Sequence, residues 1–188
     1  PAGLEEFLTA GDPALVFTLG SSAVHLAGDF YTVSLRAAAR LGRRALLLVG
    51  RETKNVLPSP LPPGIAAFDY VPFSEVLPRG AATIHQGGVG TTAQAMRAGR
   101  PMLVVPFAHD QYDHAARITR RGIGLTLERS HYDEPQVAAA LARLLGEPSF
   151  AARAAEVGAR VRAERGAAAA ADAIGRVLAG ARTIDGPP

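Results

Sequence analysis

The sequence contains no cysteine and no tryptophan, and no apolar run in it approaches the length of a membrane span. Without cysteine the chain has no disulfide, no thiolate metal site and no cysteine nucleophile. A helix needs about 20 apolar residues to cross a bilayer, so we expect none that does. A signal-peptide pattern is also missing. These features lead us to expect a cytoplasmic protein.

The sequence also has no large excess of positive or negative charge. The chain of 188 residues carries 20 basic and 17 acidic side chains, a formal net charge of +3. Its arginines are spread along the sequence, whereas a nucleic-acid surface needs them clustered, so no nucleic-acid partner is expected. With 48% hydrophobic residues, the composition is that of a globular protein. We expect one domain over residues 1–182 and a flexible tail over 183–188.

Short apolar, strand-like segments alternate with segments of helical period. Strands are expected at 14–19, 45–49, 65–70, 81–84, 102–105 and 123–127, and helices at 30–41, 92–98, 114–121 and from 133 onward. This alternation predicts an α/β fold, a Rossmann-like parallel sheet with helices on both faces and a helical C-terminal tail. Ligands of such sheets bind at the carboxyl ends of the strands.

The segment between the fourth strand and the next helix begins at His85 and reads His-Gln-Gly-Gly-Val-Gly-Thr-Thr. Backbone N–H groups and the positive end of a helix dipole meet at such a junction, and glycine lets a phosphate approach them closely. A lone His85 would more often be a core histidine bonded to backbone, and Thr91 could be only a helix cap. Together with Gly88 and Gly90, they indicate a nucleotide-diphosphate site.

Two other strand ends carry polar residues whose roles stay open. Ser21 and Ser22 follow the first strand, where they could contact phosphate or sugar, or could cap the next helix. Asp110 and Gln111 are suited to sugar hydroxyls, with helix capping as the alternative. Tyr70 and Val71 lie at a further strand end. We expect the four segments, at Gly20-Ser21, Tyr70-Val71, 85–91 and 107–111, to converge on one rim of the sheet.

A metal site was the other interpretation of the region around Asp110. His109 and Asp110, with Asp113 and His114, resemble the His and Asp ligands of metal-dependent phosphohydrolases of the HD type. Those enzymes are all-helical, which the alternating pattern disfavours. No metal or other cofactor is therefore expected.

The stretch from Tyr70 to Gln111 resembles the donor-binding signature of family 1 glycosyltransferases with the GT-B fold. The resemblance is strongest to the bacterial branch that glycosylates natural products, sterols and lipids, including the rhamnosyltransferases of rhamnolipid synthesis. It extends from Leu19 through the helices after Asp133. It implies that the chain is the C-terminal, nucleotide-sugar-binding half of such an enzyme.

The resemblance also implies roles for single residues. Tyr70 would stack on the uracil or thymine ring, and the backbone of Val71 would bond the base edge. Asp110 and Gln111 would bind the donor sugar. The diphosphate would be held by a larger set: Ser21, Ser22, His85, Gly88, Val89, Gly90 and Thr91.

Three positions depart from the family pattern. Tyr70 stands where the family often has tryptophan, and Phe73 stands where it has glutamine. Plant members bind the ribose hydroxyls through a glutamate on the helix after the glycine loop, where this chain offers Ala93 or Gln94. The contacts to the base and the ribose are therefore open at this stage.

The implied activity is inverting transfer of a hexose from a UDP- or dTDP-sugar, without a metal, to a hydroxyl of a small molecule or of a lipid at a membrane surface. The catalytic base belongs to the N-terminal, acceptor-binding domain, which this chain does not match, so no catalytic residue is expected here and the isolated half is expected to be inactive. The chain is then either a trimmed piece or a natural donor-binding subunit with a separate partner. A nucleotide-sugar 2-epimerase is a further alternative. Such an enzyme needs carboxylates close to the sugar, and Asp110 is the candidate in this sequence.

The role assigned to His85 can be tested directly. We expect His85→Ala to weaken nucleoside diphosphate binding tenfold or more, because a charge-assisted hydrogen bond contributes about 1.5–3 kcal/mol. Isothermal calorimetry measures the change. Equal affinities of the variant and the original chain would contradict the assignment.

Overall fold

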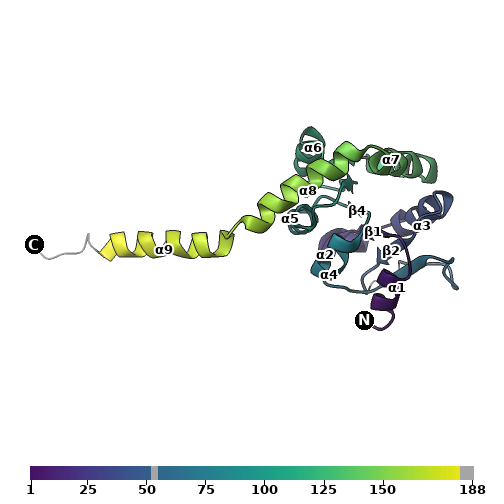
Figure 1. The fold of residues 1–188 in the computed structure, drawn as a ribbon, viewed down its shortest axis with the longest axis horizontal. Coiled ribbons are helices and arrows are strands. Elements are labelled where there is room, and N and C mark those ends of the chain that lie inside the picture. The colour runs from purple at the N-terminus through teal and green to yellow at the C-terminus, as the bar shows by residue number, and fades with distance from the viewer. Residues whose placement is uncertain (52–54, 183–188) are drawn as a thin grey trace, which may run out of the picture.

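The structure, a computed structural model, describes residues 1–51 and 55–182 and contains one six-stranded parallel sheet (Figure 1). Its strands are β1 (Leu15–Thr18), β2 (Ala45–Leu48), β3 (Ile65–Phe68), β4 (Ala82–His85), β5 (Met102–Val104) and β6 (Gly124–Thr126). They lie in the order β3-β2-β1-β4-β5-β6. The predicted fold class is confirmed, while the predicted tail at 183–188 lies outside the described residues.

Helices cover both faces of the sheet. The α-helices are α1 (Leu4–Thr9), α2 (Gly20–Ala23), α3 (Phe30–Arg40), α4 (Phe73–Val76), α5 (Val89–Ala98), α6 (Gln111–Arg120), α7 (Glu134–Gly146), α8 (Pro148–Ala163) and α9 (Gly166–Arg182). Short 3-10 turns are η1 (Val24–Leu26), η2 (Leu77–Arg79) and η3 (Arg129–His131). Helices α3 and α7 pack in one core, and α5, α6 and α8 in the other.

Alternating strand residues enter the two cores, as expected for a sheet covered on both sides. In β1, Leu15 and Phe17 contact the core under α3 and α7, whereas Val16 contacts the opposite core. All three are at most 1% exposed. Both faces of the sheet are therefore sealed, and the strand ends are the part of the sheet left for a ligand.

Three predicted boundaries need correction. Helix α5 begins at Val89 rather than Thr92, so the second half of the glycine-rich segment is its first turn. Helix α6 begins at Gln111 rather than His114, and β3 ends at Phe68 and leaves Tyr70 in a loop. Because glycine is a poor helix former, the sequence did not indicate that α5 includes Gly90. Glycine is tolerated there because the N–H groups of the first helical turn have no partner within the helix.

The helical C-terminal tail is confirmed. Figure 1 shows α9 extending away from the body of the domain, and its apolar residues Ile174, Val177 and Leu178 are 59–71% exposed. None of the helices in the described ranges combines the length and the apolar character that crossing a membrane requires.

The direction of strand addition reverses next to β1. From β1 the chain adds β2 and β3 on one side, and β4 then returns to the other side of β1. The two strands are in register, with Thr18 beside His85 at their carboxyl ends. A crevice forms at such a reversal because the connections leave in opposite directions, and it is the usual ligand site of open parallel sheets.

Candidate functional site: a crevice at the strand ends

A pocket of about 630 Å³ lies at this crevice. Its walls come from the ends of β1, β2 and β3 and from the first two turns of α5. Five residues expected in the site line it: Ser21, Tyr70, Val71, Gly90 and Thr91. Three of the four segments expected to converge thus share one pocket.

The other expected residues, all in the described ranges, do not line that pocket. They are Ser22, His85, Gly88, Val89, Asp110 and Gln111. Most are its neighbours in the chain, since Ser22 follows Ser21 in α2 and Gly88 and Val89 precede Gly90. The fourth segment lies against the glycine-rich turn, because a Cβ on Gly87 would lie 3.1 Å from the Gln111 carbonyl oxygen. In the same helix, His114 contacts the Gly87 carbonyl oxygen at 2.7 Å.

The start of α5 presents its backbone to the pocket. Gly88 is the N-cap and gives no side-chain hydrogen bond to the first amides, and the first amide bonded within the helix is that of Thr92, 2.9 Å from the Gly88 oxygen. A Cβ built on Gly90 would meet no atom within 4 Å. Packing therefore does not require glycine there, whereas close approach of an anion to the helix N-terminus does.

His85 is completely buried at the end of β4. Its Nδ1 accepts the N–H of Gly87 at 3.0 Å, so the proton of the neutral ring is on Nε2. Desolvation, with a smaller effect of His114, lowers the pKa of His85 to about 3. Nε2 has no partner among the described residues. His85 is thus a core histidine bonded to backbone that also keeps one unpaired donor, and the phosphate contact stays a prediction.

Sequence reasoning missed Gln86, which is 3% exposed. Its Nε2 would lie 2.6 Å from a Cβ on Gly20 and 2.7 Å from one on Gly88, so the amide lies between the starts of α2 and α5. Its Oε1 has no hydrogen-bond partner in the described part of the chain. Its position directly after His85, at the end of a strand, was the feature of the sequence that could have identified it. No side-chain motif distinguishes Gln86 from other polar residues in loops.

The serines after β1 are exposed and lie inside α2. The N-cap of α2 is Leu19, so the capping interpretation of Ser21 and Ser22 is wrong for this helix. The Gly20 amide instead donates to Oγ1 of Thr18 at 3.3 Å. Neither serine caps α2, and Ser21 lines the pocket at the crevice whereas Ser22 does not.

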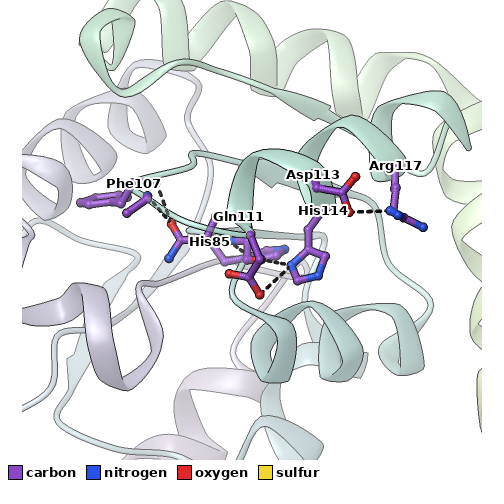
Figure 2. A network of polar contacts seen from close by, with 9 residues as sticks. His85, Phe107, Gln111, Asp113, His114 and Arg117 are labelled. Atoms are coloured by element: carbon purple, nitrogen blue, oxygen red, sulfur yellow. Dashed lines mark hydrogen bonds and ion pairs between the residues drawn. The ribbon is translucent and has the colours of Figure 1, made fainter.

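Asp110 and Gln111 differ in their surroundings, and Figure 2 shows the side chain of Gln111 beside Phe107. The Oε1 of Gln111 accepts the N–H groups of Phe107 and Ala108 at 2.7 and 3.1 Å, which holds the loop after β5. Asp110 is the N-cap of α6 yet makes no capping bond, and 57% of its side chain is exposed. The preceding His109 has a positive φ of 55°, so the backbone before α6 turns sharply. Sugar binding by the pair stays a prediction.

The acidic and histidine side chains here do not form a metal site. Within the described ranges no three His, Cys, Asp or Glu side chains are placed to hold an ion. Asp113 instead pairs with Arg117 at 2.6 Å, and Asp110 lies 3.8 Å from Nδ1 of His114.

The far end of the pocket is formed by the loop after β3. Tyr70 is 70% exposed, so its ring is available for stacking, whereas the side chain of Val71 is 1% exposed and leaves only its backbone for a ligand. Asp69 and Phe73 also line this end. Of the two candidates for the ribose, Gln94 lines the pocket and Ala93 does not.

Residues 34–174 match the family model described as erythromycin biosynthesis protein CIII-like, C-terminal domain. This match covers well over half of the chain, including Tyr70, His85 and Asp110. The chain belongs to this family. It is the C-terminal, nucleotide-sugar-binding half of a GT-B glycosyltransferase.

The relatives of this EryCIII-like domain include two sugar transferases of Streptomyces. The chain is 38% identical over 165 residues to O-mycaminosyltylonolide 6-deoxyallosyltransferase of Streptomyces fradiae, covering 87% of this chain and 38% of that protein. It is 33% identical over 154 residues to L-demethylnoviosyl transferase of Streptomyces niveus, covering 78% and 40%. The chain therefore spans about two fifths of the length of these relatives.

Solved structures agree with this relationship. The glycotransferase of kitacinnamycin superimposes with a TM-score of 0.80 at 27% identity, covering 94% of this chain and 44% of that one. The spinosyn rhamnosyltransferase SpnG, solved with thymidine diphosphate, gives 0.73 at 28%, covering 81% and 42%. Glycosyltransferase VinC, solved with dTDP, gives 0.71 at 30%, covering 87% and 41%.

Burial of His85 in the EryCIII-like domain predicts a pH dependence of stability. The unfolded chain binds a proton on this histidine below pH 6.5, whereas the folded one stays neutral down to about pH 3. Because the unfolded state then binds more protons, the free energy of unfolding falls as the pH drops through this window, by up to about 1.4 kcal/mol per pH unit.

Urea unfolding between pH 5 and 7 measures this slope. His85→Asn offers the Gly87 amide an acceptor at the position of Nδ1 but does not titrate, so its free energy of unfolding should depend less on pH. Equal slopes in the two proteins would show that His85 is not buried in its neutral form.

Proposed function

We propose that the crevice binds the nucleoside diphosphate of a sugar donor and that its base is thymine. The observation that carries the proposal is the meeting, in one pocket, of the uncapped start of α5 at Gly90 and the exposed ring of Tyr70. A helix N-terminus attracts the diphosphate, and an aromatic ring stacks on a base. Two structural relatives solved with thymidine diphosphate support the choice of base.

In this proposal the diphosphate lies against the first amides of α5, with the Ser21 and Ser22 hydroxyls on its other side. Nε2 of His85 and the side-chain NH2 of Gln86 add donors behind the glycine-rich turn. Both residues are buried, and Nε2 of His85 has no hydrogen-bond partner among the described residues. Buried polar atoms normally have a partner, which supports a ligand there. Asp110 and Gln111 stand on the sugar side.

The intact protein would transfer the sugar with the acceptor-binding half that lies outside this chain. A base of that half would take the proton of an acceptor hydroxyl, whose oxygen attacks the anomeric carbon as the bond to the diphosphate oxygen breaks. The configuration inverts, and the negative charge left on the diphosphate is stabilised by the helix dipole and the N–H groups of Val89, Gly90 and Thr91. The family and the named relatives support a natural product as the acceptor.

Calorimetry of the 188-residue chain with dTDP, UDP and AMP tests donor binding, with EDTA present to remove divalent cations. We expect micromolar to millimolar binding of dTDP and much weaker binding of AMP. Absence of dTDP binding, both in this chain and in a protein that includes the acceptor-binding half, would overturn the proposal.

The glycine at position 90 offers a test with little effect on folding. Gly90→Ala places a methyl group where the backbone faces the pocket, so dTDP affinity should fall about tenfold or more. Alanine meets no protein atom there and is the better helix former, so stability should stay equal or rise by up to about 1 kcal/mol.

Calorimetry and thermal unfolding measure the two effects. Gly175→Ala in α9 is the matched control, because its Cβ also meets no atom within 4 Å but lies outside the pocket. Unchanged dTDP affinity in Gly90→Ala would contradict close approach of the diphosphate to this turn.

Gln94 provides a test of the base and ribose. Gln94→Glu should raise UDP affinity relative to dTDP about three- to tenfold, because a carboxylate accepts a strong hydrogen bond from the 2′-hydroxyl that only UDP has. The ratio of the two affinities is the measured quantity, since the added charge also repels both diphosphates. Ala93→Glu adds the same charge beside the pocket and should leave the ratio unchanged.

A further inference from the structure

The peptide groups around Gly87 are held from two sides by imidazole rings (Figure 2). Its N–H donates to Nδ1 of His85 at 3.0 Å, and its carbonyl oxygen lies 2.7 Å from Nδ1 of His114. The φ of Gly87 is +90°, and a Cβ there would lie 2.8 Å from Val104. Gly87 therefore has one tightly constrained conformation between β4 and α5.

The two contacts place a proton on Nδ1 of His114 but not on Nδ1 of His85. Nδ1 of His85 accepts a hydrogen bond, so its proton is on Nε2. The Gly87 carbonyl can only accept, so Nδ1 of His114 carries the proton that it donates. The structure thereby assigns a specific task to His114, a residue of α6 that is partly buried and does not line the diphosphate pocket.

A trans peptide is planar, and its C=O and N–H point in opposite directions. By holding the Gly87 carbonyl toward α6, His114 directs the N–H of Gly88 away from α6. Gly88 is the N-cap of α5, and its own carbonyl accepts the first helical bond, from Thr92. The orientation of this one peptide thus determines how α5 begins.

We propose that His114 is a positioning residue for donor binding, which orients the Gly87–Gly88 peptide through its Nδ1–H. The inference rests on the proposed diphosphate site at the start of α5. No direct contact of His114 with the donor is needed. It acts through the backbone that the diphosphate approaches.

His114 also connects the two loops that meet the donor. Its Nδ1 lies 3.8 Å from Oδ2 of Asp110, one helical turn earlier. The neighbouring Gln111 holds the loop after β5 through Phe107 and Ala108. The first turn of α6 therefore ties the proposed sugar side to the diphosphate side, and a displaced His114 would disturb both.

Asparagine is the informative replacement, because its side-chain nitrogen is as many bonds from Cα as Nδ1 of histidine. We expect His114→Ala to lower dTDP affinity about tenfold and His114→Asn to restore it to within about threefold of the original. Arg117→Ala is the control on the same helix, since the exposed Arg117 pairs with Asp113 and does not line the diphosphate pocket, and it should leave affinity unchanged.

A second readout needs no ligand. Nitrogen-15 spectra of the histidine rings should show His114 protonated at Nδ1 and His85 at Nε2. The amide resonance of Gly88 should shift in His114→Ala and return toward its original position in His114→Asn.

The outcomes separate the two proposals. If the original chain binds dTDP and His114→Ala binds it equally well, the role of His114 is overturned while the donor site stands. Equal weakening in the Ala and Asn variants, or the absence of a proton from Nδ1 of His114, also overturns it. Failure of dTDP to bind both the original chain and a protein that includes the acceptor-binding half overturns the donor site, and the positioning role falls with it.

Discussion

The pairing of β1 with β4 is the constraint on which the rest of the site depends. It places Thr18 beside His85 and makes the connections after the two strands leave in opposite directions. The crevice between these connections brings the start of α2 next to the start of α5. Loss of this strand order would separate Gly20 from Gln86, although every local element could still form.

Close approach of backbone segments then shapes the crevice. Gly20 and Gly88 flank the Gln86 amide so tightly that a Cβ on either would collide with it. On the outer side of α5, a Cβ on Gly158 of α8 would lie 2.6 Å from the Cα of Gly99 at the end of α5. Helix α5 is therefore anchored at its C-terminal end by packing and at its N-terminal end by the turn at Gly87, which suits the proposed diphosphate site.

The two imidazoles that contact Gly87 differ in burial, since His85 is fully buried and His114 is partly exposed. His85 is neutral because desolvation opposes its charged form, and it is held at the end of a central strand. His114 is partly exposed and lies near the carboxylate of Asp110. One ring accepts from the turn and the other donates to it, so the peptide groups of Gly87 have partners on both sides without a phosphate present.

The α/β class, the places of the six strands and the polar residues that follow them were predictable from the sequence, because hydrophobic runs and glycine turns are local properties of the chain. The resemblance on Tyr70 to Gln111 added the family, which the comparisons confirm. The burial of His85 and the position of Gln86 between two helix starts were not predictable in this way, because they arise from the packing of distant segments. Burial of a side chain at a strand end depends on the strands beside it and the helices that cover it. The proton positions on His85 and His114 depend on their contacts with Gly87, which lies between β4 and α5 and is contacted by α6.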